Sequence, residues 1–194
     1  MKLYDISQEV FSCAVYPGDP EPRKQTLCAT GAGDGYNLTA FSMCAHNGTH
    51  IDAPFHFLPE GKTVDWMGLI PFVGPCYVAW HRGDVTAADA RQILDRSQGT
   101  QRLLIAGPVT VTAEAAEVFA GENLLLLGNE GQTIGPADAP MEVHKILLGR
   151  EVALLEGILL DGVPEGHYFL SAAPLNLAGA DGAPCRACLV DFET

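Results

Sequence analysis

The sequence predicts a mixed α/β fold, and three observations carry this prediction. Short apolar runs typical of buried strands alternate with segments that begin at helix caps. The N-terminal and C-terminal thirds of the chain have β-like patterns instead. A chain of 194 residues suits one domain, because domains commonly hold about 100 to 200 residues. We therefore expect residues 1–194 to form a single domain without internal repeats or a long linker.

The first third of the chain is predicted to contain loops, a strand and an extended segment with one polar face. Residues 16–38 are rich in proline and glycine, which indicates loops. Residues 39–45 have the pattern of a strand. From His50 to His56 polar and apolar residues alternate, so an extended segment would turn its polar side chains to one side and its apolar side chains to the core.

The middle of the chain is predicted to alternate strands with capped helices. Apolar runs predict strands at residues 76–80, 103–105 and 124–127. Thr86 begins a helix to about Ser97 through a capping box with Asp89. Thr112 begins a second helix to about Ala120.

Two further elements are predicted near the C-terminal third. Asp138 is expected to cap a helix that has Pro140 in its first turn and contains His144. A strand over residues 152–155 then leads to Glu156. A carboxylate at the end of an apolar strand is either a surface residue or a group with a buried partner, and the local sequence leaves both open.

Composition argues against several classes of partner. The net charge is −13 at pH 7 with neutral histidines, which opposes binding to nucleic acid or to an anionic membrane. No apolar run approaches the roughly 20 residues that span a bilayer, and no signal-peptide pattern is present. The six scattered cysteines are expected to be free thiols in a reducing cytosol. We therefore expect a cytoplasmic protein with a small-molecule substrate.

Residues 46–56 contain three of the six histidines and an aspartate. Histidine and aspartate together suit Zn²⁺, Mn²⁺ and similar ions, whereas structural zinc sites are usually rich in cysteine. Gly48 and Pro54 disfavour a regular helix, so His46 and His50 are not the paired ligands of a helical zinc protease. The alternative is that these are ordinary polar or core histidines. Crowding so many titratable groups together without a ligand costs free energy, which a bound metal would offset. The cluster predicts a catalytic metal site.

The cluster contains all seven positions of a known signature, His-x-Gly-Thr-His-x-Asp-x-Pro-x-His. This string resembles the signature of the cyclase family of metal-dependent hydrolases, which includes bacterial kynurenine formamidase and isatin hydrolase. Further resemblance lies at Tyr4-Asp5-Ile6-Ser7, Tyr16-Pro17-Gly18-Asp19-Pro20, Gly74-Pro75, His144 and Leu155-Glu156-Gly157. The resemblance implies a swivelling β/β/α fold with a barrel-like mixed sheet, which composition alone does not predict.

The resemblance also implies a binuclear metal site and an oligomer. It places His46, His50 and Asp52 on one ion, with Asp52 bridging to a second ion held by His144 and Glu156. In the family a histidine and a glutamate twelve residues apart complete the site, and His144 and Glu156 have this spacing. The expected cofactor is two divalent ions per chain, zinc first and manganese as the alternative. The expected assembly is a homodimer or homotetramer.

Four other residues receive roles from the resemblance or from position. His56 stays off the metals in the family and acts as general acid/base, which suits a histidine near pH 7. The early segment supplies an aromatic residue to the pocket wall, for which Tyr16 and Phe11 are candidates by position. Tyr16 could instead cover the edge of the core. Trp66 is a further candidate for substrate binding, with core packing as its alternative.

The implied reaction is hydrolysis of a carbon–nitrogen bond by metal-bound hydroxide. A divalent metal lowers the pKa of bound water to about 7 and polarises a carbonyl, and His56 would protonate the departing amine. The leading hypothesis is an arylformamidase that converts N-formylkynurenine to kynurenine and formate. The alternatives are an isatin hydrolase-like enzyme for cyclic amides, an ester or lactone hydrolase, and a metal-binding protein without turnover.

Two departures from the family concern the substrate more than hydrolysis. Residues 127–135 lack the Thr-Asp-Thr-Pro-Ser-like string that many members have in this loop. Tyr16 stands where the formamidases tend to have tryptophan.

Overall fold

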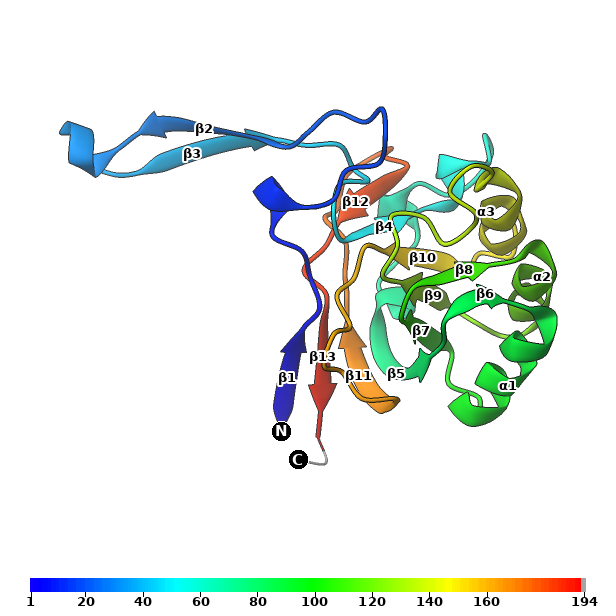
Figure 1. Ribbon diagram of the computed structural model, residues 1–194. Coiled ribbons are helices and arrows are strands. Elements are labelled where there is room, and N and C mark those ends of the chain that lie inside the picture. The colour runs from blue at the N-terminus through cyan, green and yellow to red at the C-terminus, as the bar shows by residue number, and fades with distance from the viewer. Residues whose placement is uncertain (193–194) are drawn as a thin grey trace.

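The computed structural model describes residues 1–192, in which a curled sheet of nine strands forms the body of the fold (Figure 1). The strand order is β1-β13-β11-β5-β7-β9-β10-β4-β12. These strands are β1 (Lys2–Asp5), β4 (His50–Asp52), β5 (Val73–Trp80), β7 (Arg102–Ala106), β9 (Leu126–Asn129), β10 (Ala153–Glu156), β11 (Gly166–Ser171), β12 (Gly182–Pro184) and β13 (Cys188–Asp191). Neighbours from β5 to β10 are parallel, and the other pairs are antiparallel. The curled mixed sheet confirms the predicted α/β class.

Helices cover the outer face of the parallel strands (Figure 1). They are α1 (Ala87–Ser97), α2 (Ala113–Gly121) and α3 (Met141–Leu148). Because side chains alternate along a strand, β7 contributes to two cores: Leu103 and Ile105 pack with the helical residue Phe119, whereas Leu104 packs with Ile51 on the other face. A small parallel pair, β6 (Gly83–Val85) and β8 (Val109–Val111), completes this region. Within residues 1–192, no helix is long and apolar enough to cross a bilayer.

The predicted helix caps are confirmed. The Thr86 side chain accepts from the Asp89 N–H, and the Asp89 side chain accepts from the Thr86 N–H. Thr112 accepts from the Ala115 N–H at the start of α2. Capping side chains satisfy N–H groups that the first helical turn leaves without partners.

Two predicted element starts are wrong. The strand predicted at residues 124–127 is β9, which begins at Leu126. The Leu125 N–H before it donates to the carbonyl of Gln101, which lies just before β7. Asp138 does not cap α3, since Pro140 holds the N-cap position with helical dihedrals and no side-chain cap bond. The fixed φ of proline starts this helix instead.

Residues 16–38 are not all loop, contrary to the prediction. Strand β2 (Arg23–Cys28) pairs with β3 (Leu38–Ser42), and the two project from the body as a hairpin, called here the arm (Figure 1). The strand predicted at residues 39–45 therefore ends at Ser42. The missed strand, β2, is largely exposed, so it lacks the apolar alternation by which half-buried strands are recognised.

We expect Thr86→Ala to lower the free energy of unfolding by about 1 kcal/mol, because it removes the acceptor of the capping box. Urea titration followed by circular dichroism measures this change. Thr86→Ser is the matched control, since serine keeps the hydroxyl. An equal loss in both variants would contradict the capping role.

Candidate metal centre

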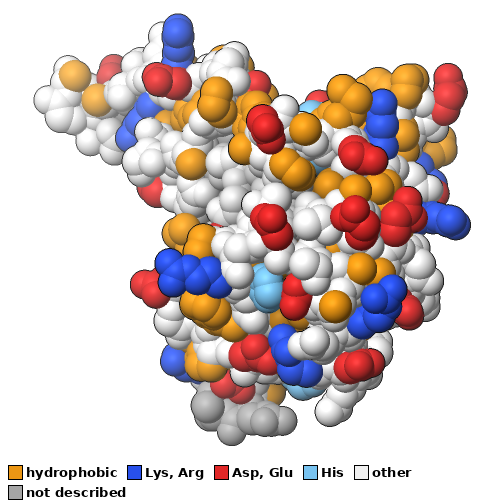
Figure 2. Space-filling view, turned by 45° about the vertical axis from the view of Figure 1, so that its right-hand side comes forward, with side chains coloured by type: hydrophobic (Ala, Val, Ile, Leu, Met, Phe, Trp, Pro, Cys, Tyr) orange, Lys and Arg blue, Asp and Glu red, His pale blue; other side chains and the backbone are white. Residues whose placement is uncertain are grey.

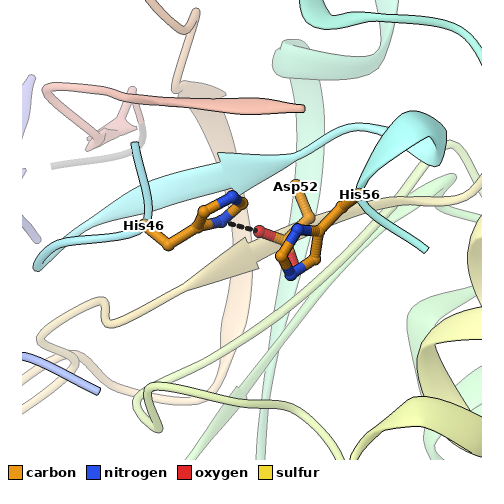
Figure 3. A group of neighbouring side chains, drawn as sticks. All are labelled: His46, Asp52 and His56. Atoms are coloured by element: carbon orange, nitrogen blue, oxygen red, sulfur yellow. Dashed lines mark hydrogen bonds and ion pairs between the residues drawn. The ribbon is translucent and has the colours of Figure 1, made fainter. Parts of the chain in front are cut away.

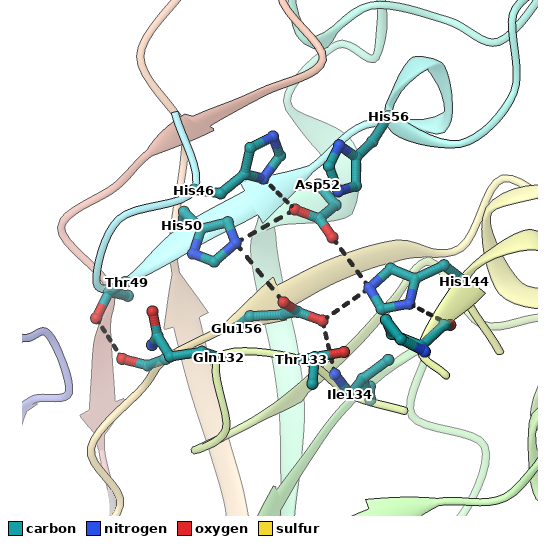
Figure 4. A network of polar contacts seen from close by, with 12 residues as sticks. His46, Thr49, His50, Asp52, His56, Gln132, Thr133, Ile134, His144 and Glu156 are labelled. Atoms are coloured by element: carbon teal, nitrogen blue, oxygen red, sulfur yellow. Dashed lines mark hydrogen bonds and ion pairs between the residues drawn. The ribbon is translucent and has the colours of Figure 1, made fainter. Parts of the chain in front are cut away.

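The centre lies where β4, β10 and α3 meet. Strand β4 pairs antiparallel with β10, which sets Glu156 opposite His50. Residues two apart on a strand share a face, so Asp52 points to the same side as His50, while Ile51 is buried in the core beneath. Helix α3 carries His144, which lies on the other side of Asp52 and Glu156 from His50 (Figure 4). The prediction of one polar face is confirmed for these residues.

The extended segment ends at Asp52 rather than at His56. Pro54–His56 forms a 3-10 turn in which the His56 N–H donates to the Ala53 carbonyl at 2.9 Å. Phe55 is 40% exposed and does not join the core. The turn lays the His56 ring beside the His46 ring, with 4.0 Å between the ring centroids, and both rings flank Asp52 (Figure 3).

Asp52 occupies the middle of the histidine cluster. Its Oδ1 is 2.8 Å from His46 Nδ1 and 3.3 Å from His50 Nε2, and its Oδ2 is 3.4 Å from His144 Nε2. Glu156 forms the second acidic side, with Oε1 3.1 Å from His144 Nε2 and Oε2 3.6 Å from His50 Nε2. Four of these five residues are buried, and His46 is partly buried.

Backbone carbonyls fix which nitrogen of each buried histidine faces the carboxylates. His50 Nδ1 lies 2.9 Å from the Gly48 carbonyl, and His144 Nδ1 lies 2.8 Å from the Pro140 carbonyl. A carbonyl only accepts, so Nδ1 carries the hydrogen and the Nε2 lone pair of a neutral ring faces Asp52 or Glu156. Lone pairs that face carboxylate oxygens require a proton or a metal cation between them.

The electrostatics point to the same need for positive charge. Burial opposes a charge on His144, but hydrogen bonds to Asp52 and Glu156 outweigh it and raise its pKa to about 10. Burial likewise opposes a charge on His46, whereas its bonds to Asp52 and Asp181 raise its pKa to about 9. Burial works against ionisation of Asp52, yet the histidines hold its pKa well below the usual range.

This donor set fits a divalent metal. Two groups have donor atoms within 4.8 Å of one another, namely His46 with Asp52 and His56, and His50 with Asp52 and Glu156. They share Asp52, as a bridging carboxylate would. Imidazole and carboxylate donors are typical of catalytic zinc and manganese sites. His56 belongs to the first group, so its place off the metals stays a prediction.

A cavity of about 390 Å³ opens over the centre. Tyr16 lines it and donates its hydroxyl hydrogen to the Ala137 carbonyl at 3.0 Å, so its role in substrate binding stays a prediction. Phe11 and Trp66 do not line this cavity. The Phe11 ring packs edge-on against Phe41 of the arm, and Trp66 is 77% exposed because its 3-10 turn buries Val64 instead.

The loop that departs from the family pattern also lines the cavity. Gln132 and Thr133 both face it. Within residues 1–192, Gln132 Oε1 and Thr133 Oγ1 are buried side-chain atoms without a hydrogen-bond partner. Buried polar atoms rarely remain unpaired, so this loop departs from the usual pattern in its polar contacts as well as in its sequence.

Sequence reasoning missed Asp181, which lines the same cavity. Its Oδ2 lies 2.8 Å from His46 Nε2 and 3.1 Å from His56 Nδ1. Asp181 directly precedes β12, where Gly182 pairs opposite Asp52. No local pattern marks a single aspartate between glycine and alanine residues. Only the long-range pairing of β12 with β4 brings it to the centre.

Comparisons with known proteins agree with this geometry. A family model described as "Putative cyclase" matches residues 4–134. A kynurenine formamidase of Paracidovorax citrulli is 37% identical over 96% of this chain and 95% of its own length. That of Salinibacter ruber is 31% identical over 98% of both chains.

Solved structures share the fold. A potential metal-dependent hydrolase with cyclase activity has a TM-score of 0.82 at 29% identity, covering 97% of this chain and 96% of its own. Isatin hydrolase A from Labrenzia aggregata has a TM-score of 0.84 at 21% identity, covering 97% and 93%. At that identity the second likeness concerns the fold alone.

We expect Asp52→Asn to lose most of its bound divalent metal, because the change removes the negative charge that faces three histidines. Metal content after dialysis against zinc, measured by elemental analysis, tests this, with circular dichroism to verify folding. Asp19→Asn is the matched control, since Asp19 lines the cavity but contacts Cys44 rather than a histidine. Equal zinc in wild type and Asp52→Asn would contradict the assignment.

Proposed function

Because the chain belongs to the cyclase family and is an amidohydrolase, we propose that it hydrolyses N-formylkynurenine to kynurenine and formate. The observation that carries the proposal is the convergence of three histidines and two carboxylates beneath one cavity. Its full-length relatives that bear the name kynurenine formamidase support the choice of substrate.

The metal ligands in this proposal follow the two halves of the centre. His46, His50 and Asp52 would hold one ion, and His144 and Glu156 would hold a second that shares Asp52. Zinc is the first candidate and manganese the alternative. A bound divalent ion polarises the amide carbonyl and lowers the pKa of water.

His56 is the proposed general acid/base. Burial lowers its pKa, so the ring is neutral near pH 7 and able to accept a proton from the attacking water. It then returns the proton to the aryl amine nitrogen as the carbon–nitrogen bond breaks. Without this proton the amine would have to leave as a poor anionic group.

The cavity suits a small aromatic amide. Tyr16 and Phe57 supply aromatic surface, while Gln132 and Thr133 add polar residues to the wall. A largely apolar pocket with a few polar groups is typical of small-molecule sites. Because these two polar residues lie in the loop that departs from the family pattern, isatin and other cyclic amides or lactones are the alternative substrates.

We expect purified protein to hydrolyse N-formylkynurenine, to lose this activity in EDTA and to regain it with Zn²⁺ or Mn²⁺. Absorbance of the released kynurenine measures turnover. Bound metal without turnover would reject this substrate and favour the cyclic amides or lactones. No bound metal after zinc or manganese is supplied would reject the metal centre itself.

We expect His56→Ala to keep its metal but to lower kcat by about 10²- to 10⁴-fold, the usual contribution of a general acid/base. His167→Ala is the matched control, because His167 is exposed on β11, away from the cavity. Loss of metal in His56→Ala would favour a metal-binding protein in which His56 is a ligand.

We also infer that the chain forms a homodimer or homotetramer through the arm. Leu27, Leu38 and Phe41 of the arm are exposed, and β2 and β3 form a sheet only with each other among the described strands. A two-stranded hairpin alone is marginally stable in water. Apolar side chains lie both on the arm and on the body (Figure 2). The apolar surface of a second copy would therefore cover the exposed side chains of the arm. The cytoplasmic location stays a prediction.

We expect light scattering coupled to size-exclusion chromatography to give two or four times the chain mass. Phe41→Glu should shift the protein toward the monomer, because a carboxylate would be buried in the contact. Gln92→Glu is the control, since Gln92 is exposed on α1, which lies far from the arm (Figure 1). A monomeric wild type would reject the assembly.

A further inference from the structure

One carboxylate oxygen of Asp181 joins two histidines of the centre. Asp181 Oδ2 is 2.8 Å from His46 Nε2 and 3.1 Å from His56 Nδ1. The two rings lie nearly face to face, with an interplanar angle of 30°. Each ring therefore has one nitrogen tied to Asp181, which leaves the other nitrogen for the chemistry of the centre.

The contact determines where each neutral ring carries its hydrogen. The Asp181 side chain is 43% exposed, and one of its oxygens lies against an imidazole nitrogen of each ring. An ionised carboxylate only accepts hydrogen bonds, so His46 holds its hydrogen on Nε2 and His56 holds its hydrogen on Nδ1. The His46 Nδ1 lone pair then faces Asp52 at 2.8 Å. His56 Nε2 has no hydrogen-bond partner among residues 1–192 and is free to accept a proton.

The backbone holds Asp181 in this place. Its carbonyl accepts from the Ala53 N–H at 2.9 Å, and the next residue, Gly182, pairs opposite Asp52. A Cβ on Gly182 would lie 2.7 Å from His46 Cε1, so this part of the chain runs directly against the His46 ring. Asp181 thus lies directly before β12, and the two rings come from the segments that flank β4, the partner strand of β12.

We propose that Asp181 is a positioning residue that sets the tautomer and ring orientation of both His46 and His56. The inference rests on the proposed function in two assignments: His46 is a metal ligand, and His56 transfers a proton. A free histidine ring favours the hydrogen on Nε2, so Asp181 imposes the less common form on His56. Residues that orient metal ligands in this way typically contribute 10- to 100-fold to metal affinity or activity.

Long-range ¹H–¹⁵N correlation spectra of histidine-labelled protein, recorded with zinc supplied, test the inference directly. We expect wild-type His56 to carry its hydrogen on Nδ1 and His46 on Nε2. In Asp181→Ala the His56 hydrogen should move to Nε2. We also expect kcat and zinc affinity to fall by about 10- to 100-fold, with a smaller change in KM.

Two further variants separate positioning from general loosening of the segment. Asp65→Ala is the matched control, because the Asp65 side chain accepts from the Gly179 N–H at 3.0 Å and so holds the same segment without touching a histidine. It should leave the histidine spectra unchanged. Asp181→Asn keeps the shape of the side chain but loses its charge, and should give a mixture of His56 tautomers, even if Asp181→Ala does not fold.

The outcomes distinguish this inference from the proposed function. Unchanged His56 and His46 tautomers in a folded Asp181 variant would overturn the inference, whatever the substrate. Altered tautomers in a protein that does not hydrolyse N-formylkynurenine would support the inference and reject that substrate.

Discussion

Two buried carboxylates that face histidine lone pairs are the constraint on which the centre depends. Asp52 and Glu156 are almost fully buried, where an uncompensated negative charge is costly. The Gly48 and Pro140 carbonyls occupy the Nδ1 hydrogens of His50 and His144. The neutral rings then have no hydrogen to give to the carboxylates. A proton on each ring or a bound metal cation resolves this conflict, and imidazole and carboxylate donors in this arrangement suit a divalent metal.

The sheet brings these groups together at one end of the parallel strands. Strand β4 is only three residues long, yet it pairs with β10 on one side and β12 on the other. Through these pairings it sets Glu156 and Asp181 on either side of the signature. Gly48 allows the sharp entry into β4, because its φ is +63° and a Cβ there would lie 2.8 Å from Cys13 Cβ. The signature therefore specifies a backbone path as well as its polar side chains.

The parts of this structure that the sequence predicts are those with a local cause. The caps at Thr86 and Thr112 depend on residues within one helical turn, and buried strands such as β7 depend on an apolar run. Strand β2 of the arm was missed because it does not bury an alternating face. The turn at residues 54–56 was hidden by an alternating sequence that also fits a strand. Asp181 joins the centre only through pairing between segments that lie far apart in the chain.

The loop over the cavity shows how substrate selection can change while the centre keeps its geometry. The Ile134 N–H donates to Glu156 Oε1 at 2.8 Å, and the Gly157 N–H donates to the Gly131 carbonyl at 2.7 Å. Both contacts use backbone groups of the loop, which nearly any residue can supply. The side chains of Gln132 and Thr133 are therefore not needed to hold Glu156 in place. Their replacement alters the cavity wall without removing these two backbone contacts. The signature therefore predicts the chemistry of the centre, whereas the identity of the substrate depends on side chains outside the signature.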